Sequence, residues 1–157
     1  MWYQNLSLWI DVSKIIAPVA LGILVWLSTR KYNKTQINLA NDKLQKELFT
    51  EFNERYDRLN ESLEELVKYD TLEELKNCET GNDLYYSLSD YFNLCAEEYY
   101  WHKKGRIDEL IWTSWKKGMD SWYDNNPIIQ EAWNNEIEQY GRTAFYMDSN
   151  DRLFEVK

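Results

Sequence analysis

The feature that most constrains the fold of this chain is a long stretch without helix breakers. Between Gly22 and Gly81 there is neither glycine nor proline, so nothing in that stretch interrupts a helix. Apolar side chains recur there about every 3.6 residues, the repeat of an amphipathic α-helix, at Ile37, Ala40, Leu44, Leu48, Phe52, Tyr56, Leu59, Leu63 and Leu66. A period of about 3.6 rather than 3.5 favours packing in a bundle over a two-stranded coiled coil.

An apolar run precedes this helix. Residues Ile15–Leu27 are apolar throughout, and the basic residues Arg30, Lys31 and Lys34 follow closely. A spanning helix needs about 20 apolar residues, and extending the run to Ile10–Thr29 includes Asp11 and Lys14. We predict that residues 1–34 form an anchor in the lipid bilayer with a basic collar, from which the long helix continues. An interfacial helix, a core helix and a signal peptide are the alternatives.

The basic residues also predict an orientation. Only Lys14 precedes the apolar run, whereas Arg30, Lys31 and Lys34 follow it. The positive-inside rule places such a collar in the cytoplasm. We therefore expect a single-pass protein whose N-terminus lies outside and whose C-terminal domain is cytoplasmic.

One stripe of the expected anchor is polar or small. Helical spacing puts five residues on it, namely Asp11, Lys14, Pro18, Gly22 and Thr29. In lipid, ionisable residues usually face protein or water, and small residues allow close helix approach. This pattern predicts a face for self-association, which could line a pore. The alternative is that Asp11 and Lys14 lie at the headgroups and the small residues have no role.

The remaining chain is expected to form an all-α bundle of four or five helices over residues 35–141, followed by a C-terminal tail over residues 142–157. Residues 35–157 carry 26 acidic and 14 basic side chains, so nucleic-acid binding is not expected. Cys78 and Cys95 are the only cysteines, and two free thiols are the default in a cytoplasmic domain.

Capping signals predict where the shorter helices begin. Thr71 with Glu74 forms a capping box, and Asn82 or Asp83 can cap a helix from Leu84 to about Lys103. Asp108 caps the next helix, and Asn126-Pro127 starts another that ends at Gly141. The tail is expected to form a strand or to dock on the bundle.

Two adjacent acids are candidate buried polar residues. Glu97 and Glu98 lie on a helix that is apolar on most sides, so one of them should point inward. A buried carboxylate needs a partner, and Arg55 or Arg58 on the long helix could supply one. The alternative is a general acid or base with a raised pKa. No nucleophile accompanies them in a recognisable motif, so we predict no catalytic residue and no enzyme activity.

Two further clusters of residues could bind a ligand, but each also has a simpler structural explanation. Cys95, Glu98 and His102 share a helical face and could bind zinc with Cys78, but CxxC spacing is absent, and we expect no metal or other cofactor. Basic residues alternate with tryptophans between Trp101 and Lys117, and this pattern could contact RNA. We expect instead that these lysines lie at helix C-termini, where the helix dipole favours them.

Two segments, ELFTEFNERYDRLNESLEEL (47–66) and DYFNLCAEEYYWHKKGRIDELIWTSWKKGM (90–119), carry a resemblance. They resemble small bacterial proteins with one N-terminal transmembrane helix and a helical cytoplasmic domain, which implies the bacterial inner membrane. The layout also looks like the membrane accessory pore protein of type VI-B CRISPR loci, which has a degenerate HEPN-type domain. HEPN ribonucleases place an arginine before a histidine with four to six residues between, but Cys95, Ala96 and Glu97 occupy those positions before His102.

These observations predict a membrane-anchored helical protein that forms homo-oligomers. It would act at the membrane as an effector or pore, in defence against phage. The alternative is a passive tether, in which the anchor only localises a domain that recruits a cytoplasmic protein partner.

Overall fold

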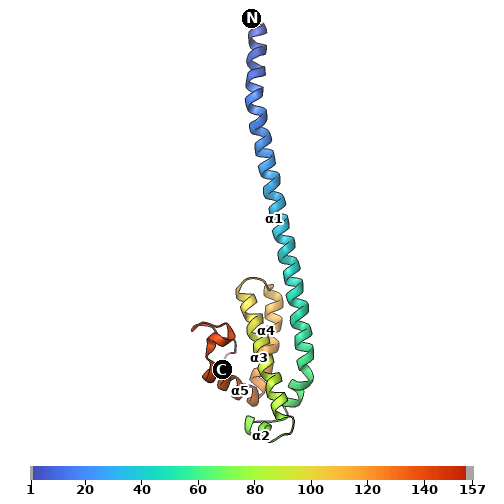
Figure 1. The fold of residues 1–157 in the computed structure, drawn as a ribbon, viewed down its shortest axis with the longest axis vertical. Helices are drawn as coiled ribbons and strands as arrows, with labels where there is room; N and C mark the ends of the chain where they lie inside the picture. The colour runs from blue at the N-terminus through green and yellow to red at the C-terminus, as the bar shows by residue number, and fades with distance from the viewer. Residues whose placement is uncertain (1, 155–157) are drawn as a thin grey trace. The chain divides into compact units, whose positions relative to one another are not determined.

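The computed structural model describes the backbone of residues 2–154 and the side chains of Lys14 and of residues 16–154. These residues form five α-helices and one 3₁₀ helix, with no strand between residues 2 and 154 (Figure 1). The prediction of an all-α protein is confirmed. The chain divides into two compact units, residues 1–43 and residues 44–157.

Helix α1 (Trp2–Leu66) is one continuous helix of 65 residues. Its part after Gly22 follows from the absence of breakers, and the helix also continues through Pro18 and Gly22. The amphipathic stripe becomes buried only from residue 44 onward. Leu48, Phe52, Leu63 and Leu66 are buried, whereas Ile37 remains 61% exposed. The C-terminal part of α1 therefore belongs to the core of the second unit.

Helix α2 (Leu72–Lys76) begins at the predicted cap. The backbone N–H of Glu74 donates to the Thr71 hydroxyl at 3.2 Å, and the Glu74 carboxylate accepts from the backbone N–H of Asp70 at 3.0 Å. Helix α3 (Gly81–Lys103) begins earlier than expected, after Thr80 rather than after Asn82 or Asp83. Gly81 is required here, because a Cβ at this position would lie 2.0 Å from the carbonyl oxygen of Leu75.

Helices α4 (Glu109–Asn125) and α5 (Pro127–Tyr140) match their capping signals. The Asp108 side chain accepts from the backbone N–H of Leu110 at 2.9 Å. Pro127 is the first residue of α5, and Gly141 ends that helix with φ of 76°, a left-handed value that glycine adopts without strain. Helix α3 contacts α2, α4 and α5, with α3 and α4 side by side in Figure 1.

The C-terminal tail docks on the bundle. It begins with the 3₁₀ helix η1 (Arg142–Phe145), and its buried side chains are Phe145, Met147, Leu153 and Phe154. Asp151 holds the segment to α3 by accepting from the Tyr99 hydroxyl at 2.7 Å and from Lys103 Nζ at 2.5 Å.

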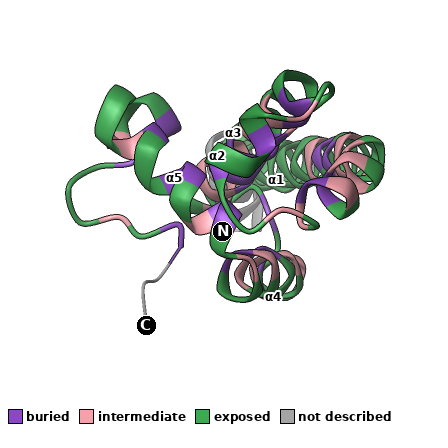
Figure 2. Ribbon diagram, turned by 90° about the horizontal axis from the view of Figure 1, so that it is seen from below, coloured by how far each residue is buried: buried purple, intermediate pink, exposed green. Residues whose placement is uncertain are grey.

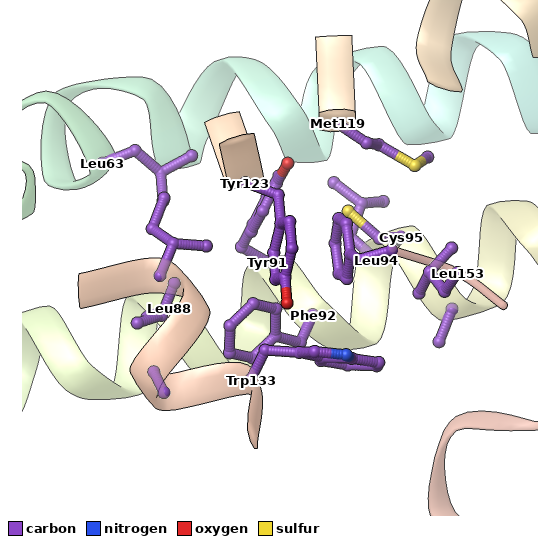
Figure 3. Close-up of a cluster of buried hydrophobic side chains, with 14 of the residues drawn as sticks. Leu63, Leu88, Tyr91, Phe92, Leu94, Cys95, Met119, Tyr123, Trp133 and Leu153 are labelled. Carbon is purple, nitrogen blue, oxygen red and sulfur yellow. The ribbon is translucent and has the colours of Figure 1, made fainter. Parts of the chain in front are cut away.

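The core of the second unit is rich in aromatic side chains. Buried and exposed stretches alternate along its helices (Figure 2), as expected where each helix packs through one side. Trp133 contacts Phe92 at a ring-centroid distance of 5.1 Å and Phe154 at 5.0 Å. Figure 3 shows Phe92 and Trp133 beside Leu88, Tyr91 and Leu94. This cluster joins α3, α5 and the tail.

The predicted membrane span and single-pass inner-membrane location are corrected by the structure. Among the residues that it describes, no helix is long and apolar enough to cross a membrane. The uninterrupted run Ile15–Leu27 rises only about 20 Å at about 1.5 Å per residue, against a hydrocarbon core of about 30 Å. The residues needed to lengthen it include Asp11, whose side chain lies outside the described ones.

Candidate functional site

Three ionisable side chains, Arg55, Glu97 and Glu98, lie where α1 and α3 are joined by hydrogen bonds. Arg55 of α1 donates two hydrogen bonds to the Glu97 carboxylate of α3, at 2.6 and 3.1 Å. Both residues are partly buried, and the pairing with Glu97 raises the pKa of Arg55. An ion pair between α1 and α3 is present and uses Arg55 rather than Arg58, but its partner is the partly exposed Glu97 and not the acid that points inward, for which the pair was expected.

Glu98 points inward and has a different environment. Its side chain is only 6% exposed, and the two hydrogen bonds of Arg55 described above go to its neighbour. Burial raises the pKa of Glu98 to about 8; the positive charge of Arg55 opposes this shift, and the negative charge of Glu97 adds to it. The carboxyl group is therefore mostly protonated at neutral pH, where it can donate as well as accept a hydrogen bond.

Glu98 faces a cavity of about 190 Å³. Helices α1, α3 and α4 all contribute to its wall, which is formed by Asn53, Tyr56, Tyr91, Leu94, Cys95, Glu98, Ser114, Trp115, Gly118 and Met119. Figure 3 shows Tyr91, Leu94, Cys95 and Met119 in this part of the core. The cavity lies entirely within the second unit.

The Tyr91 hydroxyl is buried in this wall, and no hydrogen bond of good geometry reaches it. Its hydrogen-bond interaction is a weak one with the thiol of Cys95. Burial raises the pKa of Tyr91, and the hydroxyl also interacts electrostatically with Cys95, Tyr56 and Glu98, three other residues of the wall. A buried hydroxyl without a partner typically costs about 1–3 kcal/mol. Tyr91 thus presents a weakly hydrogen-bonded polar group on the cavity side of α3.

Gly118 of α4 is an exposed residue that forms part of the cavity wall. It lies inside a helix, where glycine is less stable than alanine by about 1 kcal/mol. A Cβ at Gly118 would meet nothing within 4 Å, so packing within the described chain does not require glycine there. Sequence reasoning missed Tyr91 and Gly118, although a glycine inside a helical pattern is a recognisable signal.

The structure does not bring the four residues of the hypothetical zinc site together, although Cys95 and Glu98 line the same cavity. Cys95 is buried, and burial raises the pKa of its thiol. Cys78 instead accepts a hydrogen bond from the Tyr69 hydroxyl at 3.1 Å. The His102 ring stacks on Trp112 at 4.5 Å. Throughout the part of the chain that the structure describes, no three His, Cys, Asp or Glu side chains are placed to hold a metal ion.

The basic cluster near Trp101 is partly neutralised. Lys103 pairs with Asp148 and Asp151, and Lys116 pairs with Asp120. Lys104 lies over the Tyr100 ring at 5.3 Å. These contacts join the lysines to the protein itself, so the cluster is not a continuous basic surface.

A larger cavity of about 430 Å³ lies beside the tail and includes Arg142 and Arg152 in its wall. Arg142 donates to the backbone carbonyl of Asp151 at 2.7 Å, and Arg152 donates to the same carbonyl at 3.1 Å. Both guanidinium groups are engaged in holding the tail. We therefore regard the smaller cavity at Glu98 as the better candidate site.

A second buried acid, Glu136 on α5, has hydrogen-bond partners that account for its burial. It is 8% exposed and accepts from the Tyr85 hydroxyl at 2.8 Å and from the Ser89 hydroxyl at 3.3 Å. Sequence reasoning missed this residue, because nothing in its local pattern distinguishes it from the exposed acids nearby.

In the first unit the predicted stripe lies on an exposed helix. Lys14, Pro18, Gly22 and Thr29 are exposed, as are the collar residues Arg30, Lys31 and Lys34, while the side chain of Asp11 lies outside the described ones. The Arg30 guanidinium lies over the Trp26 ring at 4.2 Å. A Cβ at Gly22 would meet nothing within 4 Å, so packing within the described chain does not require this glycine either.

Comparison with protein-family models, with curated proteins and with solved structures gives no match. The functional argument therefore depends on the residues and their geometry alone.

Proposed function

We propose that this protein is a non-enzymatic, self-associating helical protein. The apolar segment of α1 in the first unit is the contact between copies, and the second unit is a binding module that the assembly presents. The observation that carries the proposal is the exposure of this segment. Eight of its apolar side chains are 50% to 63% exposed, namely Ile16, Val19, Leu21, Ile23, Leu24, Val25, Trp26 and Leu27.

The distribution of these side chains favours more than two copies. At about 100° per residue, they surround the helix on all sides, and a helix that is apolar all round is normally buried. Leaving eight such side chains in water costs on the order of 10 kcal/mol per chain. A two-helix contact covers one stripe only, so an assembly of several helices is needed to cover the segment.

The small residues of the stripe support close contact between copies. Gly22 weakens the helix that contains it, and a side chain there would meet nothing in the described part of the same chain. A glycine at such a position allows the backbone of another helix to approach closely. The prediction that this stripe is a self-association face is therefore kept as part of the proposal.

A HEPN-like arrangement of the bundle is also kept as part of this proposal, without its nuclease chemistry. The positions before His102 that would hold the catalytic arginine are Cys95, Ala96 and Glu97. His102 stacks on Trp112, a packing role that does not require catalysis. Binding rather than RNA cleavage is the activity that these residues support.

Sedimentation equilibrium of the full chain at 1–100 µM tests the proposal. We expect wild-type particles larger than a dimer. Leu24→Glu places a charge in the segment. It should raise the protein concentration needed for assembly at least tenfold. Leu110→Glu is the matched control, because Leu110 is 79% exposed in the second unit, and it should leave the assembly unchanged.

A monomeric wild-type protein across this range would overturn the proposal, as would equal behaviour of the two glutamate variants. Flotation with phosphatidylcholine–phosphatidylglycerol vesicles is measured in parallel. A monomer that floats with vesicles through the same segment would show that lipid, and not another copy, covers it. Dye release from the same vesicles measures whether an assembly acts on lipid.

A further inference from the structure

The cavity at Glu98 combines features that the helical fold does not itself require. A weakly hydrogen-bonded hydroxyl, a buried carboxyl group and a helix-interior glycine with open space beside it all lie in one wall. Each is unfavourable for stability on its own. Their coincidence in one small cavity is typical of a binding site, where function is retained at the expense of stability.

The chemistry of the wall selects the kind of ligand. Tyr56, Tyr91 and Trp115 contribute aromatic rings, whose faces attract cations, and Glu98 can supply a negative charge. A cation in the cavity favours the ionised form of Glu98, whereas an anion disfavours it and gains no ion pair there. A purely apolar ligand would leave both the carboxyl group and the Tyr91 hydroxyl without partners. A ligand that carries a positive charge and donates hydrogen bonds satisfies both.

The volume limits the size of the ligand. An apolar cavity of roughly 150 Å³ can hold benzene, so about 190 Å³ fits a molecule of about eight non-hydrogen atoms. A divalent metal ion is a poorer fit, because no group of three ligating side chains is formed among residues 14 and 16–154.

We infer that this cavity binds a small organic ammonium ion, with Glu98 as its counter-ion, the Tyr91 hydroxyl as a hydrogen-bond acceptor and the surrounding aromatic rings as its walls. Arg55 remains paired with Glu97, which leaves Glu98 available to the ligand. Binding the cation stabilises the ionised form of Glu98. The inference is independent of the proposed self-association, since the cavity belongs to the second unit alone.

Calorimetric titration with three compounds of nearly equal size tests the inference: benzylammonium, benzyl alcohol and benzoate. We expect benzylammonium to bind wild-type protein at least tenfold more tightly than either benzyl alcohol or benzoate. Glu98→Gln keeps the shape of the side chain but removes its charge, and should weaken benzylammonium binding at least tenfold. Gly118→Leu fills the cavity and should abolish binding.

Glu136→Gln is the matched control, because it changes the other buried acid, which lies outside the cavity wall. It should leave the affinity for benzylammonium unchanged. Circular dichroism verifies that each variant is folded. If Gly118→Leu does not fold, the affinity of Glu98→Gln for benzylammonium is the deciding measurement. Absence of benzylammonium binding to wild-type protein would overturn the inference. So would equal affinity for benzyl alcohol, or undiminished binding by Glu98→Gln.

Discussion

At the scale of single residues, two neighbouring acids of α3 have opposite roles. Glu97 is held by two hydrogen bonds from Arg55, whereas Glu98 is buried beside a cavity and largely protonated at neutral pH. The sequence predicts that one of them points inward but does not say which, because residues one apart on a helix differ by only about 100°. The answer depends on how α1 and α4 pack around α3.

Glu98→Gln should change the pH dependence of stability. The pKa of Glu98 is about 8 in the folded state, against an ordinary value of 4.5, so folding favours the protonated acid. Between these pH values the unfolded chain has lost the proton and the folded one retains it, and wild-type stability therefore falls as pH rises. The glutamine variant lacks this penalty, which reaches about 4 kcal/mol by pH 8. Urea unfolding should give equal stabilities near pH 4 and a more stable variant at pH 8.

Replacement by alanine should have opposite effects on stability at Gly81 and at Gly118. In Gly81→Ala the new Cβ would lie 2.0 Å from the Leu75 carbonyl oxygen, so we expect a loss of about 1–3 kcal/mol. Gly118→Ala meets nothing within 4 Å and should gain about 0.5–1 kcal/mol from the higher helix propensity of alanine. Thermal unfolding of the two variants measures both effects, and equal shifts would contradict the stated difference in packing.

At the scale of elements, the docking of the C-terminal tail on α3 depends on the carboxylate of Asp151. Asp151 accepts from Lys103, from Tyr99 and from the backbone N–H of Asp148, and the hydrogen bond from Lys103 is the main reason that its pKa is lowered to about 2. A lowered pKa stabilises the fold at pH values above the unfolded value of about 4, and this contribution is lost as pH falls toward 2.

Asp151→Asn should therefore loosen the tail. Hydrogen exchange of residues 142–154 should be faster in this variant, with less change in α4. Asp148→Asn is the matched control, because Asp148 also pairs with Lys103 but is more exposed, at 65% against 11% for the Asp151 side chain. Equal exchange in both variants would argue against a special role for Asp151.

Most of the elements could be predicted from the sequence. The breaker-free stretch predicts the part of α1 after Gly22, and the caps at Thr71 and Asp108 locate α2 and α4. The start of α3 could not be predicted, because it depends on a close backbone contact at Gly81. The cavity could not be predicted either, since its wall joins residues of three helices that periodicity alone does not bring together.

At the scale of the whole molecule, the core lies in the second unit. All the described buried apolar residues fall between Leu48 and Phe154, and residues 44–157 form a unit of their own. A fragment of residues 44–157 should therefore fold with a cooperative thermal transition and remain monomeric at concentrations where the full chain assembles. Circular dichroism and light scattering test this together. A fragment that fails to fold would show that residues 1–43 contribute to the core.

The different surroundings of the two thiols have a practical consequence. Cys95 is buried with a raised pKa, whereas Cys78 is partly exposed and its pKa is lowered by hydrogen bonds from Thr80 and Tyr69. Because the thiolate is the reactive form, a maleimide dye added to native protein should couple selectively at Cys78. Fluorescence studies of assembly could then use the unaltered polypeptide, with one probe per chain at a known place.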